Sequence, residues 1–140
     1  MADLSYRGLD ELILDMQAVA ELPDEVVDEM LNAQADIVVA AQKEQGRAMG
    51  VADTGLTLRS IKKGKVKLKK GVRVLYITPT GTRGRGKTRV RNAEIAFVNE
   101  YGKRGQKARP FIQLANEKSA QAATQAAAEV YDRFLKSKDL

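Results

Sequence analysis

The stretch Lys65-Val-Lys-Leu-Lys-Lys-Gly-Val-Arg-Val-Leu-Tyr-Ile-Thr78 decides the fold of this protein. Apolar residues alternate with lysine up to Lys69, and after Lys70-Gly71 a second run follows that is rich in β-branched and aromatic residues. Alternation with a period of two is typical of strands, and a tight turn containing glycine joins two strands into a hairpin. The stretch therefore predicts a hairpin over about residues 64–79, with an outer face of lysine and arginine.

The segments before the hairpin have helical spacing instead. Apolar residues fall on one stripe over residues 8–22 and again over residues 24–45. Pro23 separates the two runs and is suited to be the first residue of the second helix, because its missing N–H has no partner there. We expect Gly46 and Gly50 to end that helix.

Between the second helix and the hairpin, residues 54–61 are short and ambiguous. They predict a turn followed by one or two helical turns, with Leu58 and Ile61 buried under the fold.

The segment after the hairpin, residues 79–91, contains three glycines and five basic residues. Such a composition favours a mobile basic loop over a part of the core. Asn92 is suited to cap a helix over residues 93–101, which Gly102 would end in a left-handed conformation. A strand is the alternative for this segment, because its apolar residues also fit a period of two.

The last predicted element is a long helix over residues 110–135, which opens on proline and has an alanine-rich middle. We expect Phe111 in the core beside Tyr101. The fold class predicted for the single domain 1–140 is α+β. In it, a small and mainly antiparallel sheet packs against an N-terminal helix pair and the long C-terminal helix.

The composition excludes several classes of chemistry. The 140 residues include no cysteine and no histidine, so disulfides, zinc fingers and imidazole acid–base catalysis are ruled out. No apolar run approaches the roughly 20 residues of a membrane span, and the N-terminus is acidic. We therefore expect no membrane span, no export signal, no catalytic residue, no cofactor and no metal.

Charge is distributed unevenly along the chain. Residues 1–53 hold 12 acidic and three basic residues, whereas residues 54–93 hold 13 basic residues and no acidic one. Residues 94–140 hold six acidic and eight basic residues, and the net charge of the whole chain is +6. The basic middle is suited to meet nucleic acid, an acidic protein, or the acidic third of a neighbouring copy.

The basic residues of the hairpin and the following loop are the candidate surface for a partner or for DNA. They are Lys65, Lys67, Lys69, Arg83, Arg85, Lys87, Arg89 and Arg91. Phosphate contacts would make DNA binding dependent on salt, but aromatic residues for stacking are scarce, since Tyr76 stands alone between Arg7 and Phe97. Two alternatives remain: contact with nucleic acid without sequence specificity, or pairing with the acidic helices of a neighbouring subunit.

Residues 81–88, Gly-Thr-Arg-Gly-Arg-Gly-Lys-Thr, match the phosphate-binding pattern G-x-x-x-x-G-K-[ST]. In that motif backbone N–H groups cradle a phosphate, Lys87 would neutralise it and Thr88 would hold magnesium. A nucleotide-hydrolysing fold also needs a parallel sheet and an apolar strand that ends in aspartate, which the rest of the chain does not offer. A phosphate-binding loop is therefore kept as a remote alternative.

Several short segments occur in a recognisable order. They are Gly8-Leu9-Asp10-Glu11-Leu12, Thr54-Gly55-Leu56, Ser60-Ile61, Ala96-Phe97-Val98-Asn99-Glu100-Tyr101-Gly102 and Ala108-Arg109-Pro110-Phe111-Ile112. With them the chain resembles the small neck or tail-completion proteins of long-tailed bacteriophages and prophages, the tail-component family of HK-type and lambda-like phages. The resemblance covers nearly the whole chain, and its most specific parts are the steps Glu100-Tyr101-Gly102 and Ala108-Arg109-Pro110-Phe111.

The resemblance implies a structural virion protein without catalysis. Such proteins form a ring, expected to be six-fold, at the head–tail junction around the DNA channel. Their neighbours are the head-closure connector and the tail terminator or tail tube proteins, and assembly takes place in the host cytoplasm. Whether the role is tail completion or tail termination stays open. An acidic third and a basic third in one chain suit the head-to-tail packing that closes a ring.

Overall fold

The computed structural model describes residues 22–51 and 55–138. In chain order the elements are α2 (Asp24–Ala48), α3 (Leu56–Arg59), β1 (Ile61–Lys63), β2 (Lys67–Lys69), β3 (Val72–Val74), β4 (Ile77–Pro79), β5 (Thr82–Arg83), the 3-10 turn η2 (Gly86–Thr88), β6 (Val90–Arg91), α4 (Asn92–Tyr101) and α5 (Phe111–Ser137). The described strand pairs are antiparallel, which confirms the predicted α+β class. The helix expected over residues 8–22 lies, apart from Leu22, outside the described residues.

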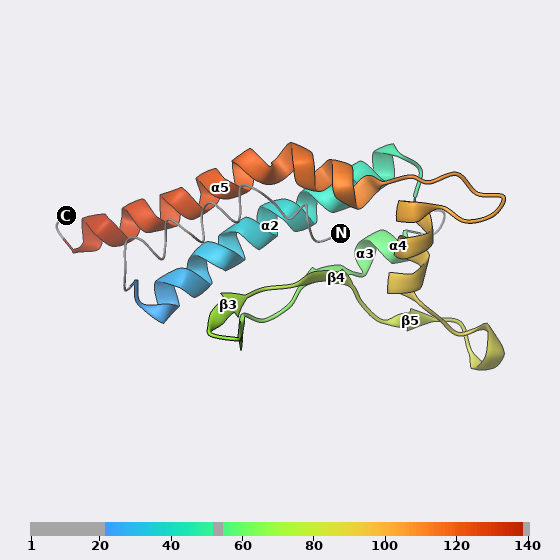
Figure 1. Cartoon of the computed structure of the whole chain (residues 1–140), viewed down its shortest axis with the longest axis horizontal. Helices are drawn as coiled ribbons and strands as arrows, with labels where there is room; N and C mark the ends of the chain where they lie inside the picture. Colours follow the sequence, from blue (N-terminus) through green and yellow to red (C-terminus); the bar gives the residue numbers. More distant parts are fainter. Residues whose placement is uncertain (1–21, 52–54, 139–140) are drawn as a thin grey trace.

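Helices α2 and α5 lie side by side and form one layer of the molecule (Figure 1). They run antiparallel, since Met30 near the start of α2 packs against Val130 near the end of α5, while Gln42 donates a hydrogen bond of 2.9 Å to Asn116. The buried side of α5 carries a small residue at every fourth position, which allows the two backbones to approach closely. These residues are Ala115, Ser119, Ala123 and Ala127.

Helix α2 begins at Asp24, as predicted, but ends three residues later than the sequence predicts. Pro23 is the residue before the helix, and the helix continues through Gly46 to Ala48. Gly46 is buried against Leu58, and a Cβ atom at this position would collide with the Leu58 side chain. This glycine therefore serves packing between α2 and α3, not the end of the helix.

The predicted hairpin is present but longer and divided into two parts. Pairing of β2 with β3 makes the outer part, and β1 pairs with β4 from Ile61 opposite Pro79 onward. Between the two parts the Gly64 N–H donates to the Tyr76 carbonyl at 2.7 Å. The turn at Lys70-Gly71 has φ values of +52° and +80°, as a two-residue hairpin turn of type I′ requires. The pairing of β1 with β4 also means that Ile61 begins a strand and does not belong to the helical turns predicted for residues 54–61.

The register of β2 and β3 decides which side chains share a face of the hairpin. Residues directly opposite one another point to the same side, and Leu68 lies opposite Arg73. Arg73 contacts α2, so this face is turned toward the helices. The opposite face, here called the outer face, carries Lys67, Lys69, Val72, Val74 and Tyr76. The prediction of an outer face that consists of lysine and arginine alone is therefore wrong.

The main core lies where α2, α3, β1, α4 and α5 meet. Its buried residues are Val51, Leu58, Ile61, Ala96 and Phe111. The predicted burial of Leu58, Ile61 and Phe111 is confirmed.

The predicted place of Tyr101 beside Phe111 is wrong. Residues 92–101 form a helix, not a strand, and this helix turns Ala96 into the core. Phe97 and Tyr101 lie on another side of it, where their ring centroids are 4.7 Å apart.

Candidate functional site

The two sequence steps of the family resemblance meet at the start of α5. Glu100 is only 6% exposed, and its carboxylate accepts hydrogen bonds from the backbone N–H groups of Ile112 at 2.8 Å and Gln113 at 3.0 Å. N–H groups in the first turn of a helix have no partner within that helix. Glu100 therefore caps α5 from the end of α4, and its charge lies at the positive end of the α5 dipole.

The loop that returns from α4 to α5 begins at Gly102. This residue has φ +77°, as predicted, and a Cβ atom here would lie 2.8 Å from the backbone nitrogen of Ala108. Farther along, the Arg109 N–H donates to the Asn99 carbonyl at 2.6 Å, and Arg109 Nη1 donates to the Gly50 carbonyl at 2.6 Å. The loop is thus held both to α4 and to the segment that follows α2.

Pro110 precedes α5 and is not its first residue, which corrects the predicted boundary by one position. Its φ and ψ of −75° and 66° are those of an inverse γ-turn, in which the Phe111 N–H donates to the Arg109 carbonyl at 2.7 Å. Proline suits this place because its ring fixes φ near −65°. The turn directs the buried Phe111 ring into the core.

Asn92 does not cap α4. Its side-chain Nδ2 donates to the Thr80 carbonyl at 2.8 Å, and the residue before the helix is Arg91. Asn92 is instead the first residue of α4 and ties it to the preceding strand segment.

The eight basic residues predicted as one surface lie in two groups. Strands β3 and β5 mark these groups at opposite ends of the strand layer (Figure 1). On the hairpin, Lys65, Lys67 and Lys69 are exposed. Lys69 Nζ lies 3.2 Å from the Tyr76 hydroxyl and 5.8 Å from the centre of its ring. This first group is mixed with aromatic and aliphatic side chains.

The second basic group lies on a short hairpin in place of the expected irregular loop. Strands β5 and β6 pair over two residues each, and η2 closes the turn between them. Its exposed members are Arg85, Lys87, Arg89 and Arg91. Arg83 does not share their surface, because it is partly buried and its Nη2 donates to Thr57 Oγ1 at 3.0 Å.

The phosphate-loop pattern over residues 81–88 does not have the geometry of that motif. Gly86, Lys87 and Thr88 form a 3-10 turn between two antiparallel strands, and α4 starts only after β6. In a phosphate-binding loop the lysine and threonine begin a helix that follows a parallel strand. Here Thr88 Oγ1 donates to the Arg85 carbonyl at 2.7 Å and closes the turn.

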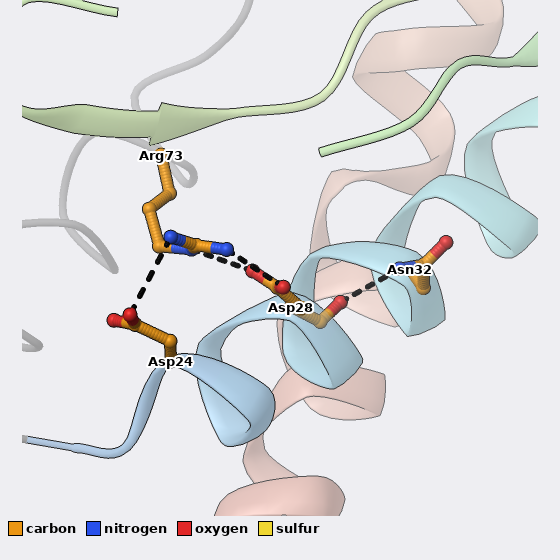
Figure 2. Close-up of polar contacts among 4 residues, drawn as sticks. All are labelled: Asp24, Asp28, Asn32 and Arg73. Carbon is orange, nitrogen blue, oxygen red and sulfur yellow. Dashed lines mark hydrogen bonds and ion pairs between the residues drawn. The ribbon is translucent and has the colours of Figure 1, made fainter. Parts of the chain in front are cut away.

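Sequence reasoning missed the contact between the hairpin and the acidic side of α2. Arg73 Nε and Nη2 donate to the two carboxylate oxygens of Asp28 at 2.6 and 2.7 Å, and Arg73 Nη1 lies 3.7 Å from Asp24 (Figure 2). Farther along α2, Lys63 Nζ lies 2.8 Å from Asp36 Oδ1. The hairpin therefore pairs with acids of its own chain. The sequence does contain a pattern that indicates this contact, because Asp24, Asp28 and Asp36 are four or eight residues apart and therefore lie on one side of a helix.

The Arg73 contact predicts a pH-dependent stability. The hydrogen bond from Arg73 lowers the pKa of Asp28, against an opposing effect of burial. A carboxyl whose pKa is lower in the folded state stabilises fully above its unfolded pKa of about 3.9, and this stabilisation is lost as the pH falls through the folded pKa. At pH 7 the Asp28→Asn variant should melt a few degrees below the wild type, and the difference should shrink below about pH 4.

Thermal unfolding followed by circular dichroism across this pH range measures the effect. Glu44→Gln removes an equal charge from an exposed position of α2 and should follow the wild type. A difference between Asp28→Asn and the wild type that stays constant with pH would contradict a stabilising ion pair.

A cavity of about 520 Å³ lies between α3, α4 and the loop that leads to α5. Basic side chains from separate segments line it, namely Arg83, Lys103 and Arg109, together with the single acid Glu94. Two of these side chains hold the fold together, since Arg83 donates to Thr57 Oγ1 and Arg109 donates to the Gly50 carbonyl.

Neither a metal site nor a membrane-spanning helix is found among the described residues. Within residues 22–51 and 55–138, no group of three or more acidic side chains gathers as a metal site would require. None of the helices in these ranges contains an apolar stretch long enough to cross a membrane.

Comparisons of the chain with models of protein families, with curated proteins and with solved structures found no match.

Proposed function

We propose that this chain is a structural protein of a tailed bacteriophage or prophage. In this proposal copies of the chain form a ring at the head–tail junction, around the channel that DNA crosses. One face of the ring meets the head-closure connector, and the other meets the tail terminator or tail tube. The protein acts by assembly and not by catalysis, and its mature location is the virion.

The observation that supports the proposal is the contact between the two sequence steps that suggested it. The Glu100 carboxylate caps the helix that begins at Phe111, directly after Pro110, through two hydrogen bonds of 2.8 and 3.0 Å. If the two short sequence matches had arisen independently, their residues would not be expected to contact each other. Here they form one structural unit, in which Gly102 and Arg109 hold the loop between them.

The exposed basic groups fit a ring around DNA. The β5–β6 hairpin extends away from the helix layer (Figure 1), and four of its arginine and lysine side chains are exposed. A row of such hairpins around a channel would contact phosphate without reading sequence. The same feature favours the second candidate, a basic protein that binds nucleic acid without forming part of a virion.

Deletion of the gene from the phage or prophage that carries it separates the two candidates. The ring proposal predicts filled heads and complete tails that stay unjoined, visible by electron microscopy, and recovery of virions when the gene is supplied in trans. A normal yield of joined virions from the deletion strain would overturn the proposal.

The nucleic-acid candidate is tested on the purified protein. The triple variant Arg85→Gln, Lys87→Gln, Arg89→Gln removes three positive charges that would face phosphate. It should flatten the log–log salt dependence of DNA affinity by about 0.9 for each phosphate that the variant no longer neutralises. The matched control is Lys65→Gln, Lys67→Gln, Lys69→Gln on the other basic group. Tight DNA binding by a monomer, together with joined virions in the deletion strain, would favour the second candidate.

A further inference from the structure

Helix α4 exposes two aromatic side chains that lie next to each other. Phe97 is 62% exposed and Tyr101 is 51% exposed, and their ring planes are tilted by 47° at a centroid distance of 4.7 Å. They lie one helical turn apart, and Glu94 lies on the same side one turn before Phe97. Large exposed aromatic groups are typical anchors of protein interfaces. This set is called the α4 face, and it consists of Glu94, Phe97 and Tyr101.

The outer face of the hairpin also exposes apolar side chains. Its centre is formed by Val72, Val74 and Tyr76, of which Val72 is 37% and Tyr76 48% exposed. Lys67 and Lys69 flank this centre and are exposed. Helix α2 packs on the opposite side of the hairpin, through Arg73. The outer face therefore offers an apolar centre with a positively charged edge.

The two faces are complementary in chemistry. Each has an apolar centre with at least one aromatic ring, and the lysines of the outer face match the carboxylate of Glu94 on the α4 face. Glu94 has an exposed partner in its own chain, Arg91, at 3.3 Å. An exposed pair of this kind contributes little, so its exchange for a lysine of another chain costs little.

The two faces do not meet within one copy, because β3 and α4 lie well apart along the long axis of the molecule (Figure 1). A contact between two different surfaces of identical copies is heterologous, and it generates a ring when the rotation between copies closes. We propose that the outer face of the hairpin of one copy docks on the α4 face of the next copy. This inference rests on the ring formation of the proposed function and assigns the surfaces that form it.

Two double variants remove one face each without touching the core. The α4 variant is Phe97→Ser with Tyr101→Ser, and the hairpin variant is Val72→Ser with Tyr76→Ser. Leu68→Ser is the matched control, because Leu68 is 68% exposed on the opposite side of the same hairpin. By sedimentation velocity the wild type and the control should assemble, whereas each double variant should sediment as a monomer with an unchanged circular dichroism spectrum.

An equimolar mixture of the two variants gives the sharper result. The intact hairpin of the α4 variant can dock on the intact α4 face of the hairpin variant, and no further face is then available. The mixture should therefore form dimers and stop there. A symmetric contact of like faces predicts no gain of mass on mixing, and that result would overturn the inference.

Charge reversal gives a second test that does not depend on the apolar residues. Glu94→Lys should prevent assembly, and the combination with Lys67→Glu and Lys69→Glu in the same chain should restore it. If the wild type forms rings and the double variants also form them, the assigned contact is wrong and the ring proposal stands. A wild type that stays monomeric at all concentrations, together with a normal yield of joined virions from the deletion strain, would contradict the ring itself.

Discussion

Replacement of Phe111 by alanine should lower the free energy of unfolding by about 3–5 kcal/mol. Phe111 is fully buried, and it contacts a cluster that Leu58, Ile61 and Ala96 form from separate elements. Because these elements are also fixed by their own contacts, the cavity left by the ring cannot close by local collapse. Urea unfolding followed by far-UV circular dichroism measures the loss directly.

Tyr101→Ala is the matched control for this prediction. The sequence places both aromatic rings together in the core, but Tyr101 lies at the surface, in contact with Phe97. Its loss should cost about 1 kcal/mol or less when the protein is diluted below the concentration at which copies assemble. Equal losses from the two variants would contradict the described core.

Replacement of Glu100 by alanine should be the next most destabilising change, at about 2–4 kcal/mol. It removes a buried carboxylate and leaves the backbone N–H groups of Ile112 and Gln113 without their acceptor. Glu100→Gln keeps one carbonyl oxygen and should lose about half as much. Denaturant unfolding gives the free energies.

Amide hydrogen exchange locates the Glu100 effect. The amides of Ile112 and Gln113 should exchange faster in Glu100→Ala, whereas amides in the middle of α5 should change in proportion to global stability alone. Unchanged protection at Ile112 and Gln113 would contradict the capping role of Glu100.

Much of the local structure could be predicted from the sequence because it depends on neighbours in the chain. Alternation located the hairpin, and Lys70-Gly71 located its turn, since few residues accept positive φ at two successive positions. Gly102 was predicted as the left-handed residue that ends a helix, a position that favours glycine. Alternation does not say which face is buried when both faces are mixed, and here the position of Asp28 directs Arg73 inward.

The rest of the candidate site depends on contacts between elements that are distant in sequence. Glu100 is recognisable as part of a motif, but its role requires the return of the chain to α5 through the Gly102 turn. In the sequence Gly46 has the properties of a residue that ends a helix, and only its contact with Leu58 explains why a glycine is needed within α2. The phosphate-loop pattern was satisfied by composition, whereas pairing of Arg83 with Val90 makes a hairpin of the same residues.

The pairing of α2 with α5 has a consequence for the order in which the chain folds. The hydrogen bond from Gln42 to Asn116 joins residues 74 positions apart, whereas the hairpins and α4 close over short distances in sequence. At about 5–20 residues per second, synthesis of the intervening chain takes roughly 4–15 s. During this time the apolar side of α2 emerges from the ribosome before α5 exists to cover it. Closure of the helix layer therefore has to wait for α5, and a chain released before α5 is complete leaves Met30 without Ala127 and Val130, which bury it.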